Sequence, residues 1–164
     1  MQEAASQEKQ ASEKIKYYPI NEAAAKRAKE MNSFSDYTPG SATLEYKSLV
    51  DQAAEIAENQ KKRIDPSFHG KIDALLDTYS RKFAANMNNS FDIDARIPSV
   101  LIAGGSNFPV RKKEKQNAAR DKNYKEWKDI QGLLEKIRST GMGGILSLPV
   151  FSFCKIVSTF CLIF

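Results

Sequence analysis

The stretch that decides the fold is IDPSFHGKIDALLDTYSRKFAANMNNS, which runs from Ile64 to Ser90. Asp65 is a suitable N-cap, and Pro66 follows at the first helical position, where its missing N–H costs no hydrogen bond. Apolar side chains then recur at intervals of three and four residues, as on one face of a helix. They are Phe68, Ile72, Leu75, Leu76, Tyr79, Phe83 and Met87. The pattern predicts a long amphipathic helix that ends in the polar run NMNNS, residues 86–90.

Two helical segments precede this stretch. A short helix is expected to begin after Asn21, which can act as its N-cap, with Glu22 in the first turn where the helix dipole favours an anion. A second helix is predicted over about 42–63, with Ser41 or Thr43 as its cap. Its apolar positions are Tyr46, Leu49, Val50, Ala53, Ile56 and Ala57.

A last long helix is predicted over about 109–139, with Ser106 or Asn107 as its cap. Its first half is almost wholly polar, and its second half carries a core stripe. That stripe is Tyr124, Trp127, Ile130, Leu133, Leu134 and Ile137. The apolar run at residues 100–102 has no second strand to pair with, so a buried connection is expected there. The fold class is therefore all-α, a small antiparallel bundle of three to four helices.

Composition divides the chain into three parts. Residues 1–16 are polar and predict a disordered leader, and residues 17–144 form the helical domain. Residues 145–164, ILSLPVFSFCKIVSTFCLIF, are an apolar tail of about the length of a membrane span. A lysine at the centre of a span costs about 2.5–3.5 kcal/mol, and Lys155 stands there. The tail is interpreted as a weak anchor, a segment that packs on the bundle, or a truncation or frameshift ending.

The net charge of +5 is concentrated in one segment. Residues 1–108 hold 14 Lys/Arg and 15 Asp/Glu, whereas residues 109–138 hold 10 and 5. The densest part of this segment supplies the candidate binding residues, which are Arg111, Lys112, Lys113, Lys115, Arg120 and Lys122. Three cations in a first turn oppose the helix dipole, which favours contact with an anion. The alternatives are a solvated helix face, a nucleic-acid backbone and an acidic protein partner.

Other motifs give no catalytic or cofactor site. The loop GGSNFP lacks the Gly-Lys-Ser/Thr ending and the βαβ setting of a nucleotide loop, and is read as a turn. His69 is the only histidine, and both cysteines lie in the tail, so no zinc set is formed. Asp92 and Asp94 are read as turn residues rather than cation ligands. We therefore expect neither a cofactor nor a metal, and no enzymatic activity.

Three pieces of the chain resemble an uncharacterised protein family of bacterial mobile elements, of the integrative and conjugative kind. They are KYYPINEAAAKRAKEMNSFSDYTPGSATLEYKSLVDQA, DARIPSVLIAGGSNFPVRKKEKQNAARDKN and IQGLLEKIRSTGMGGI, and the likeness spans about Lys16 to Ile145. The family has no catalytic motif to transfer to this sequence. Its members continue with a polar helical segment where this chain departs at Leu146.

These observations lead to three functional hypotheses for a cytoplasmic protein without a signal peptide. The first is a non-enzymatic accessory protein of a mobile element that contacts DNA or RNA backbone through its basic helix. The second is a protein-binding module that inhibits a host defence system directed at nucleic acids, of the anti-restriction or anti-CRISPR type. The third is a protein weakly anchored to a membrane by its tail.

Overall fold

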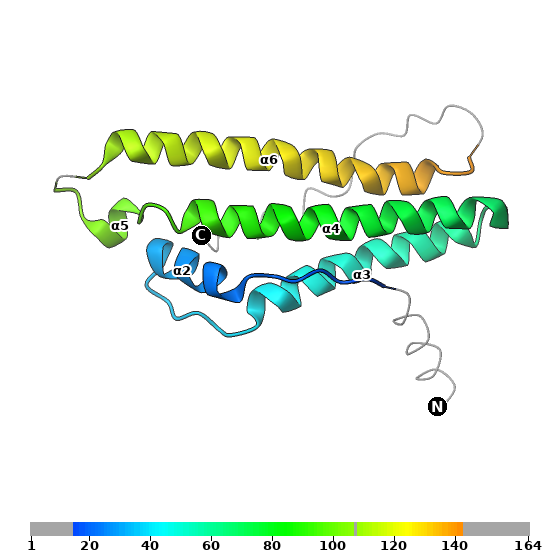
Figure 1. The fold of residues 1–164 in the computed structure, drawn as a ribbon, viewed down its shortest axis with the longest axis horizontal. Helices are drawn as coiled ribbons and strands as arrows, with labels where there is room; N and C mark the ends of the chain where they lie inside the picture. Colours follow the sequence, from blue (N-terminus) through cyan, green and yellow to red (C-terminus); the bar gives the residue numbers. More distant parts are fainter. Residues whose placement is uncertain (1–14, 107, 143–164) are drawn as a thin grey trace.

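The computed structural model describes residues 15–106 and 108–142, and within them the chain forms helices without β-strands (Figure 1). The elements are α2 (Glu22–Asn32), α3 (Ser41–Lys61), the 3-10 helix η1 (Pro66–Phe68), α4 (His69–Asp94), α5 (Val100–Ala103) and α6 (Val110–Ser139). Helix α4 lies between α3 and α6 and runs antiparallel to both. The predicted antiparallel bundle is confirmed. The expected number of helices was slightly too low, because the short α5 is an additional element in the described part.

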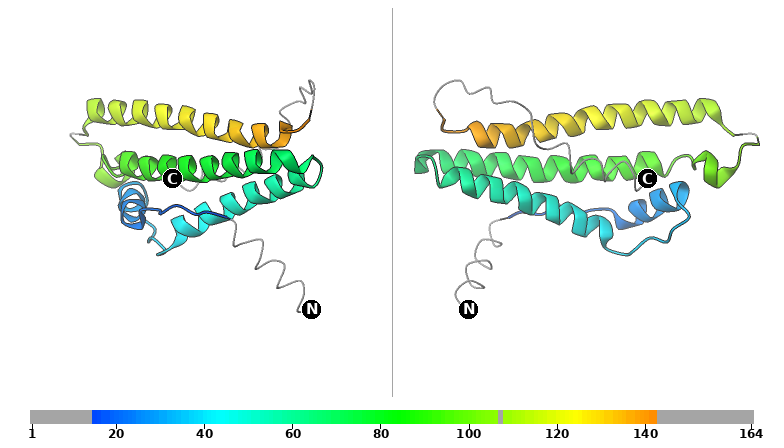
Figure 2. Two further views of the ribbon diagram at one scale, coloured as in Figure 1. Left: turned by 45° about the vertical axis from the view of Figure 1, so that its right-hand side comes forward. Right: turned by 180° about the vertical axis from the view of Figure 1, so that it is seen from behind.

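The core is built around α4, which packs against α2, α3 and α6. Figure 2 shows that α6 runs alongside α4, whereas α3 crosses it obliquely. In the centre, the rings of Tyr46 and Tyr79 stack on Phe83 with centroid separations of 5.9 and 5.6 Å. One face of α2 is buried, and it consists of the small residues Ala24, Ala25 and Ala28. This close packing of α2 is available because alanine lets two helix backbones approach.

The predicted leader and tail lie outside the described residues, except for the end of the leader. There, Ile15 packs against the core, and Lys16 Nζ lies 3.7 Å from Asp77 Oδ1. The backbone N–H of Tyr18 donates to Tyr46 Oη at 3.0 Å. Contacts with the bundle therefore extend to Ile15, within the segment predicted as leader. No helix in the described ranges is both long and apolar enough to cross a membrane.

Helix α4 does not end at NMNNS but continues to Asp94. Asparagine side chains usually end helices by competing for backbone groups, yet here they bond to other elements. Asn86 Nδ2 donates to the Asn123 carbonyl of α6 at 2.9 Å, and Asn88 Nδ2 donates to the Pro19 carbonyl at 3.1 Å. Phe91 is buried in the continued helix. Tertiary contacts therefore override the local signal.

The helix starts also differ from expectation. Neither Ser41 nor Thr43 caps α3, whose N-cap is Gly40 at a φ of 84°. The carboxylate of Glu22 on α2 serves instead, since it accepts from Gly40 N at 3.0 Å and from Thr43 N at 2.7 Å. Helix α6 follows Pro109, and among the described residues no side chain caps it, so the expectation for Ser106 is wrong. Asn107 lies outside the described residues.

Two expectations about the connection between α4 and α6 were wrong. The run at residues 100–102 lies in the short helix α5 and is not buried as expected, because Leu101 is 77% exposed. Asp92 and Asp94 belong to the last turn of α4 rather than to a loop. This connection turns the chain around the end of α4, and Asp94 faces α6.

Candidate functional site

The basic segment identified in the sequence forms the first half of α6, at the outer edge of the bundle (Figure 1). Four of its six candidate cations, Arg111, Lys112, Lys115 and Lys122, are exposed. We call these four residues the α6 basic surface. The remaining two are partly buried. Lys113 contacts Ile97 in the connection after α4, and Arg120 contacts Asp94 at the end of α4. The structure thus divides a cluster that the sequence presents as uniform.

The α6 basic surface is mostly a stripe along the helix. With a turn of about 100° per residue, Lys115 and Lys122 lie about 40° and 20° from Arg111 around the axis. These three residues span about 16 Å along it. The acidic side chains Glu114 and Asp121 lie together about 60–80° to one side of Arg111. The stripe therefore keeps its positive charge, with a mixed-charge strip along one flank.

Arg120 has a structural role at the junction of α2, α4 and α6. Its Nε donates to Asp94 Oδ1 at 2.5 Å, and its Nη2 donates to Asn32 Oδ1 at 3.3 Å. The Asp94 side chain is only 12% exposed, against 37% for Arg120. Arg120 therefore neutralises a nearly buried carboxylate within the bundle, whereas the sequence presents it as one of six equivalent cations.

The side chain of Lys113 also points toward the bundle. Its Nζ donates to the Ile97 carbonyl at 3.4 Å. Burial lowers the pKa of Lys113, and the positive charge of Arg120 lowers it further, while Asp94 opposes the shift. This lysine therefore contributes less to the exposed charge than its neighbours do.

Two buried polar residues explain how a nearly all-polar half-helix is held in place. Gln116 is 2% exposed, and its Nε2 donates to the Ile93 carbonyl at the end of α4 at 2.7 Å. Asn123 accepts at Oδ1 from Asn86 Nδ2 at 3.0 Å and from Asn89 Nδ2 at 2.7 Å. Sequence reasoning missed both, because polar residues spaced seven apart on a helix carry no hydrophobic signal. Their spacing, which repeats one helix face, was the available clue.

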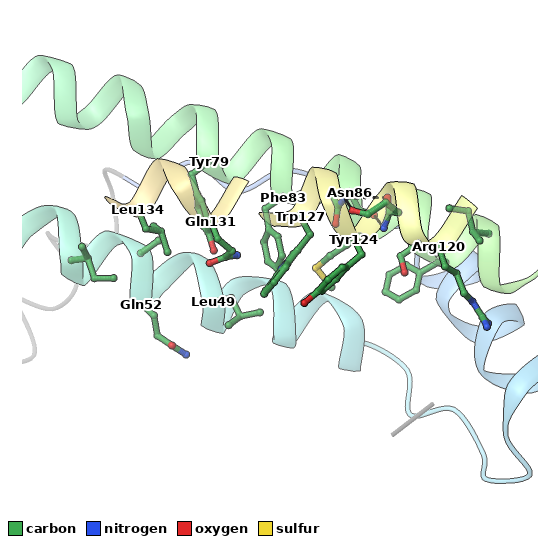
Figure 3. Close-up of a pocket in the computed structure, with 17 residues that line it drawn as sticks. Leu49, Gln52, Tyr79, Phe83, Asn86, Arg120, Tyr124, Trp127, Gln131 and Leu134 are labelled. Atoms are coloured by element: carbon green, nitrogen blue, oxygen red, sulfur yellow. Dashed lines mark hydrogen bonds between the residues drawn. The ribbon is translucent and has the colours of Figure 1, made fainter. Parts of the chain in front are cut away.

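A second feature is an apolar groove with a volume of about 220 Å³ between α3, α4 and α6 (Figure 3). Leu49 and Gln52 of α3 lie on one side, and Trp127 and Tyr124 of α6 lie on the other. Tyr79, Phe83 and Met87 of α4 contribute to the lining between them. Arg120 lies at one end of the groove and Leu134 at the other.

The aromatic wall of this groove was expected to be core. Tyr124 and Trp127 do stack, with ring centroids 5.5 Å apart and planes 13° apart. However, Tyr124 is 50% exposed, and the ammonium of Lys128 lies 4.7 Å from its ring centre. The predicted stripe is therefore fully buried only from Ile130 onward. Trp127 is partly buried against the core, and Tyr124 and Trp127 together form one wall of an open groove.

The other candidate groups have structural roles. His69 Nε2 lies 3.0 Å from the Lys61 carbonyl oxygen, where it joins the start of α4 to the end of α3. Within the ranges that the structure describes, no three His, Cys, Asp or Glu side chains are grouped to hold a metal ion.

Comparisons with known proteins add no relative to this picture. No protein-family model, no curated protein and no solved structure matches the chain. The functional proposal therefore rests on the geometry of α6 and on the sequence itself.

Proposed function

We propose that the protein is a non-enzymatic accessory protein that binds nucleic acid through the α6 basic surface. The observation that carries the proposal is the exposure of Arg111, Lys112, Lys115 and Lys122 at one end of a helix on the edge of the bundle. Duplex DNA presents one negative charge per about 1.7 Å of axis, so a stripe about 16 Å long faces several phosphates. The resemblance of residues 16–145 to mobile-element proteins supports an accessory role in such an element.

The arrangement favours backbone contact over reading of bases. The four cations lie at the ends of long flexible side chains, and no aromatic side chain stands among residues 110–123 on which a base could stack. Electrostatic contact of this kind is largely independent of nucleic-acid sequence and weakens steeply with salt. Four phosphate contacts predict a slope of about −3 to −4 in a plot of log K against log salt concentration.

The test compares the wild type with a variant in which Arg111, Lys112, Lys115 and Lys122 are all changed to Gln. Binding is measured by fluorescence anisotropy over a salt series, with duplex DNA and single-stranded RNA of arbitrary sequence. The matched control changes one Arg and three Lys elsewhere, namely Lys62, Arg63, Lys71 and Lys82, which are also exposed. Both variants lose the same charge, so only contact geometry distinguishes them.

We expect the α6 variant to lose most of its affinity and most of its salt slope, and the control variant to keep both. Absence of binding by the wild type at low salt would contradict the proposal, and so would an equal loss in both variants. Co-purification of a host protein after nuclease treatment, abolished only in the α6 variant, would instead support the protein-binding hypothesis.

A further inference from the structure

The described part of the bundle has an open position. Helices α3, α4 and α6 run up, down and up, and α3 and α6 flank α4 (Figure 1). In an up-down-up-down bundle, the fourth element returns antiparallel to the third and packs between the first and the third. That position is the groove between α3 and α6, with α4 behind it.

The lining of the groove favours an apolar and nearly uncharged occupant. Its walls are aliphatic and aromatic, with Ile56 of α3 and Trp127 of α6 among them. Among the described residues that line it, Arg120 is the only charged side chain, and that charge is neutralised by Asp94. A charged segment would lose hydration there without gaining a partner.

Residues 145–164 have the composition and the length for this position. Lys155 is the only charged side chain among them, and most of the others are aliphatic or aromatic. As a helix, twenty residues extend about 30 Å. The stretch of α6 from Ser139 back to Arg120 measures about 28 Å by the same rise, so the tail can cover the whole groove.

Helix α6 ends in a turn that lies beside the end of α3. Gln60 Nε2 of α3 donates to the Thr140 carbonyl at 2.8 Å, which holds the two helix ends together. Gly141 follows with a φ of 78°, as in the left-handed residue that commonly ends a helix. A Cβ atom there would lie 2.9 Å from Ile64 Cγ2, so a side chain would be both strained and crowded.

From the open position, its lining and the turn that precedes the tail, we infer that residues 145–164 fold back within the same chain and occupy the groove. The tail runs antiparallel to α6, and it covers Trp127 and the apolar side chains around it. It is then a fourth layer of the bundle rather than a membrane anchor. This inference is independent of the nucleic-acid proposal, which concerns the opposite face of α6.

The chain supplies its own probes for a test. Cys154 and Cys161 are the only cysteines and both lie in the tail, while Trp127 is the only tryptophan and lies in the groove wall. Each cysteine is labelled singly with a nitroxide in the full-length protein, the other being changed to Ser. The Trp127 indole N–H resonance and the backbone amides of α2 and α6 are then followed by NMR.

We expect the Cys154 label to broaden the Trp127 indole signal at all protein concentrations, while Ala28 on α2 keeps its intensity. The Cys161 label is expected to act further along the groove, near Asn123. A Trp127 signal unaffected by either label would overturn the inference. Broadening that appears in a mixture of labelled and isotope-enriched chains would also overturn it, since a second copy would then fill the groove.

A pair of substitutions on α3 gives a further check. Leu49→Glu places a charge in the groove lining and is expected to restore the Trp127 signal in the labelled protein. Leu44→Glu, at a position 68% exposed on the same helix, should leave the broadening unchanged. Restoration by both variants, or by neither in chains that keep their helical circular dichroism, would contradict occupation of the groove.

Discussion

At the scale of single residues, similar side chains on one helix have opposite roles. Arg120 and Lys122 stand two positions apart in the same charged run, yet Arg120 faces a nearly buried carboxylate and Lys122 faces solvent. The 100° rotation per residue separates them by about 160° around α6 when measured the shorter way. The charge distribution in the sequence therefore located the basic helix, but it could not show which cations of that helix are exposed.

This division predicts different effects on stability. Arg120→Gln should lower the free energy of unfolding by about 1–3 kcal/mol, because Asp94 loses its charged partner in a largely desolvated position. Lys122→Gln should change it by less than about 0.5 kcal/mol. Urea denaturation, with the slope of the unfolding free energy checked for constancy, measures both values.

A double variant supplies the control for this prediction. If the two side chains interact as the 2.5 Å contact indicates, the effects of Arg120→Gln and Asp94→Asn will not add. Additive losses would show that the ion pair contributes nothing to stability.

At the scale of elements, the sequence predicts helices well and their ends poorly. Apolar periodicity located α3, α4 and the second half of α6, because burial of a helix face is a property of neighbouring residues in the chain. The ends depend on residues far away in sequence. Glu22 caps α3 from α2, and Asn123 of α6 bonds the asparagines that would otherwise end α4. Periodicity cannot report such contacts.

The open groove escaped prediction for a related reason. Leu49, Phe83 and Trp127 have the spacing of core residues, and each was correctly assigned to the inward face of its helix. Whether an inward face is covered depends on how far neighbouring helices diverge, and α3 crosses α4 obliquely (Figure 2). The crossing angle arises from packing between helices and cannot be predicted from the sequence of one helix alone.

The cap that Glu22 provides should make stability depend on pH. Burial alone would raise the pKa of Glu22, but hydrogen bonds from Thr43, Tyr37 and the α3 backbone outweigh it, so the pKa falls below its ordinary value of 4.5. A lowered folded-state pKa means that the stabilisation is complete above about 4.5 and is lost as the pH falls through the folded-state value.

Glu22→Gln should therefore lower the free energy of unfolding by about 1–2 kcal/mol at neutral pH, and by progressively less in acid. Urea midpoints measured between neutral and acidic pH will give the profile. Glu55→Gln, at an exposed position on α3, is the matched control and should follow the wild type. A constant difference between Glu22→Gln and the wild type at every pH would contradict the lowered pKa.

At the scale of the whole molecule, α4 is the element on which the described structure depends. It packs against α2, α3, α6 and η1, whereas α5 is a single turn that exposes Val100 and Leu101. The free energy of local opening is small where few apolar contacts are lost, and it approaches the free energy of global unfolding where many are lost. The bundle should thus open from its connection between α4 and α6 inward.

Native-state hydrogen exchange tests this order. Amides in the middle of α4, around Phe83, should exchange only through global unfolding, with protection that falls in parallel with stability as urea is added. Amides of α5 should exchange faster by several orders of magnitude and independently of urea. Uniform protection across α4 and α5 would show that the connection belongs to the same cooperative unit as the core.

The position of α6 at the edge of the bundle has a kinetic consequence. Residues 109–138 carry a net charge of +5, while residues 1–108 carry −1, so the molecule has a strong charge asymmetry between one edge and the rest. The electric field of a polyanion orients such a molecule before contact, so that α6 faces the polyanion. A larger fraction of collisions then occurs in the binding orientation. Because salt screens the field, the association rate should fall with added salt even where the final contacts are few.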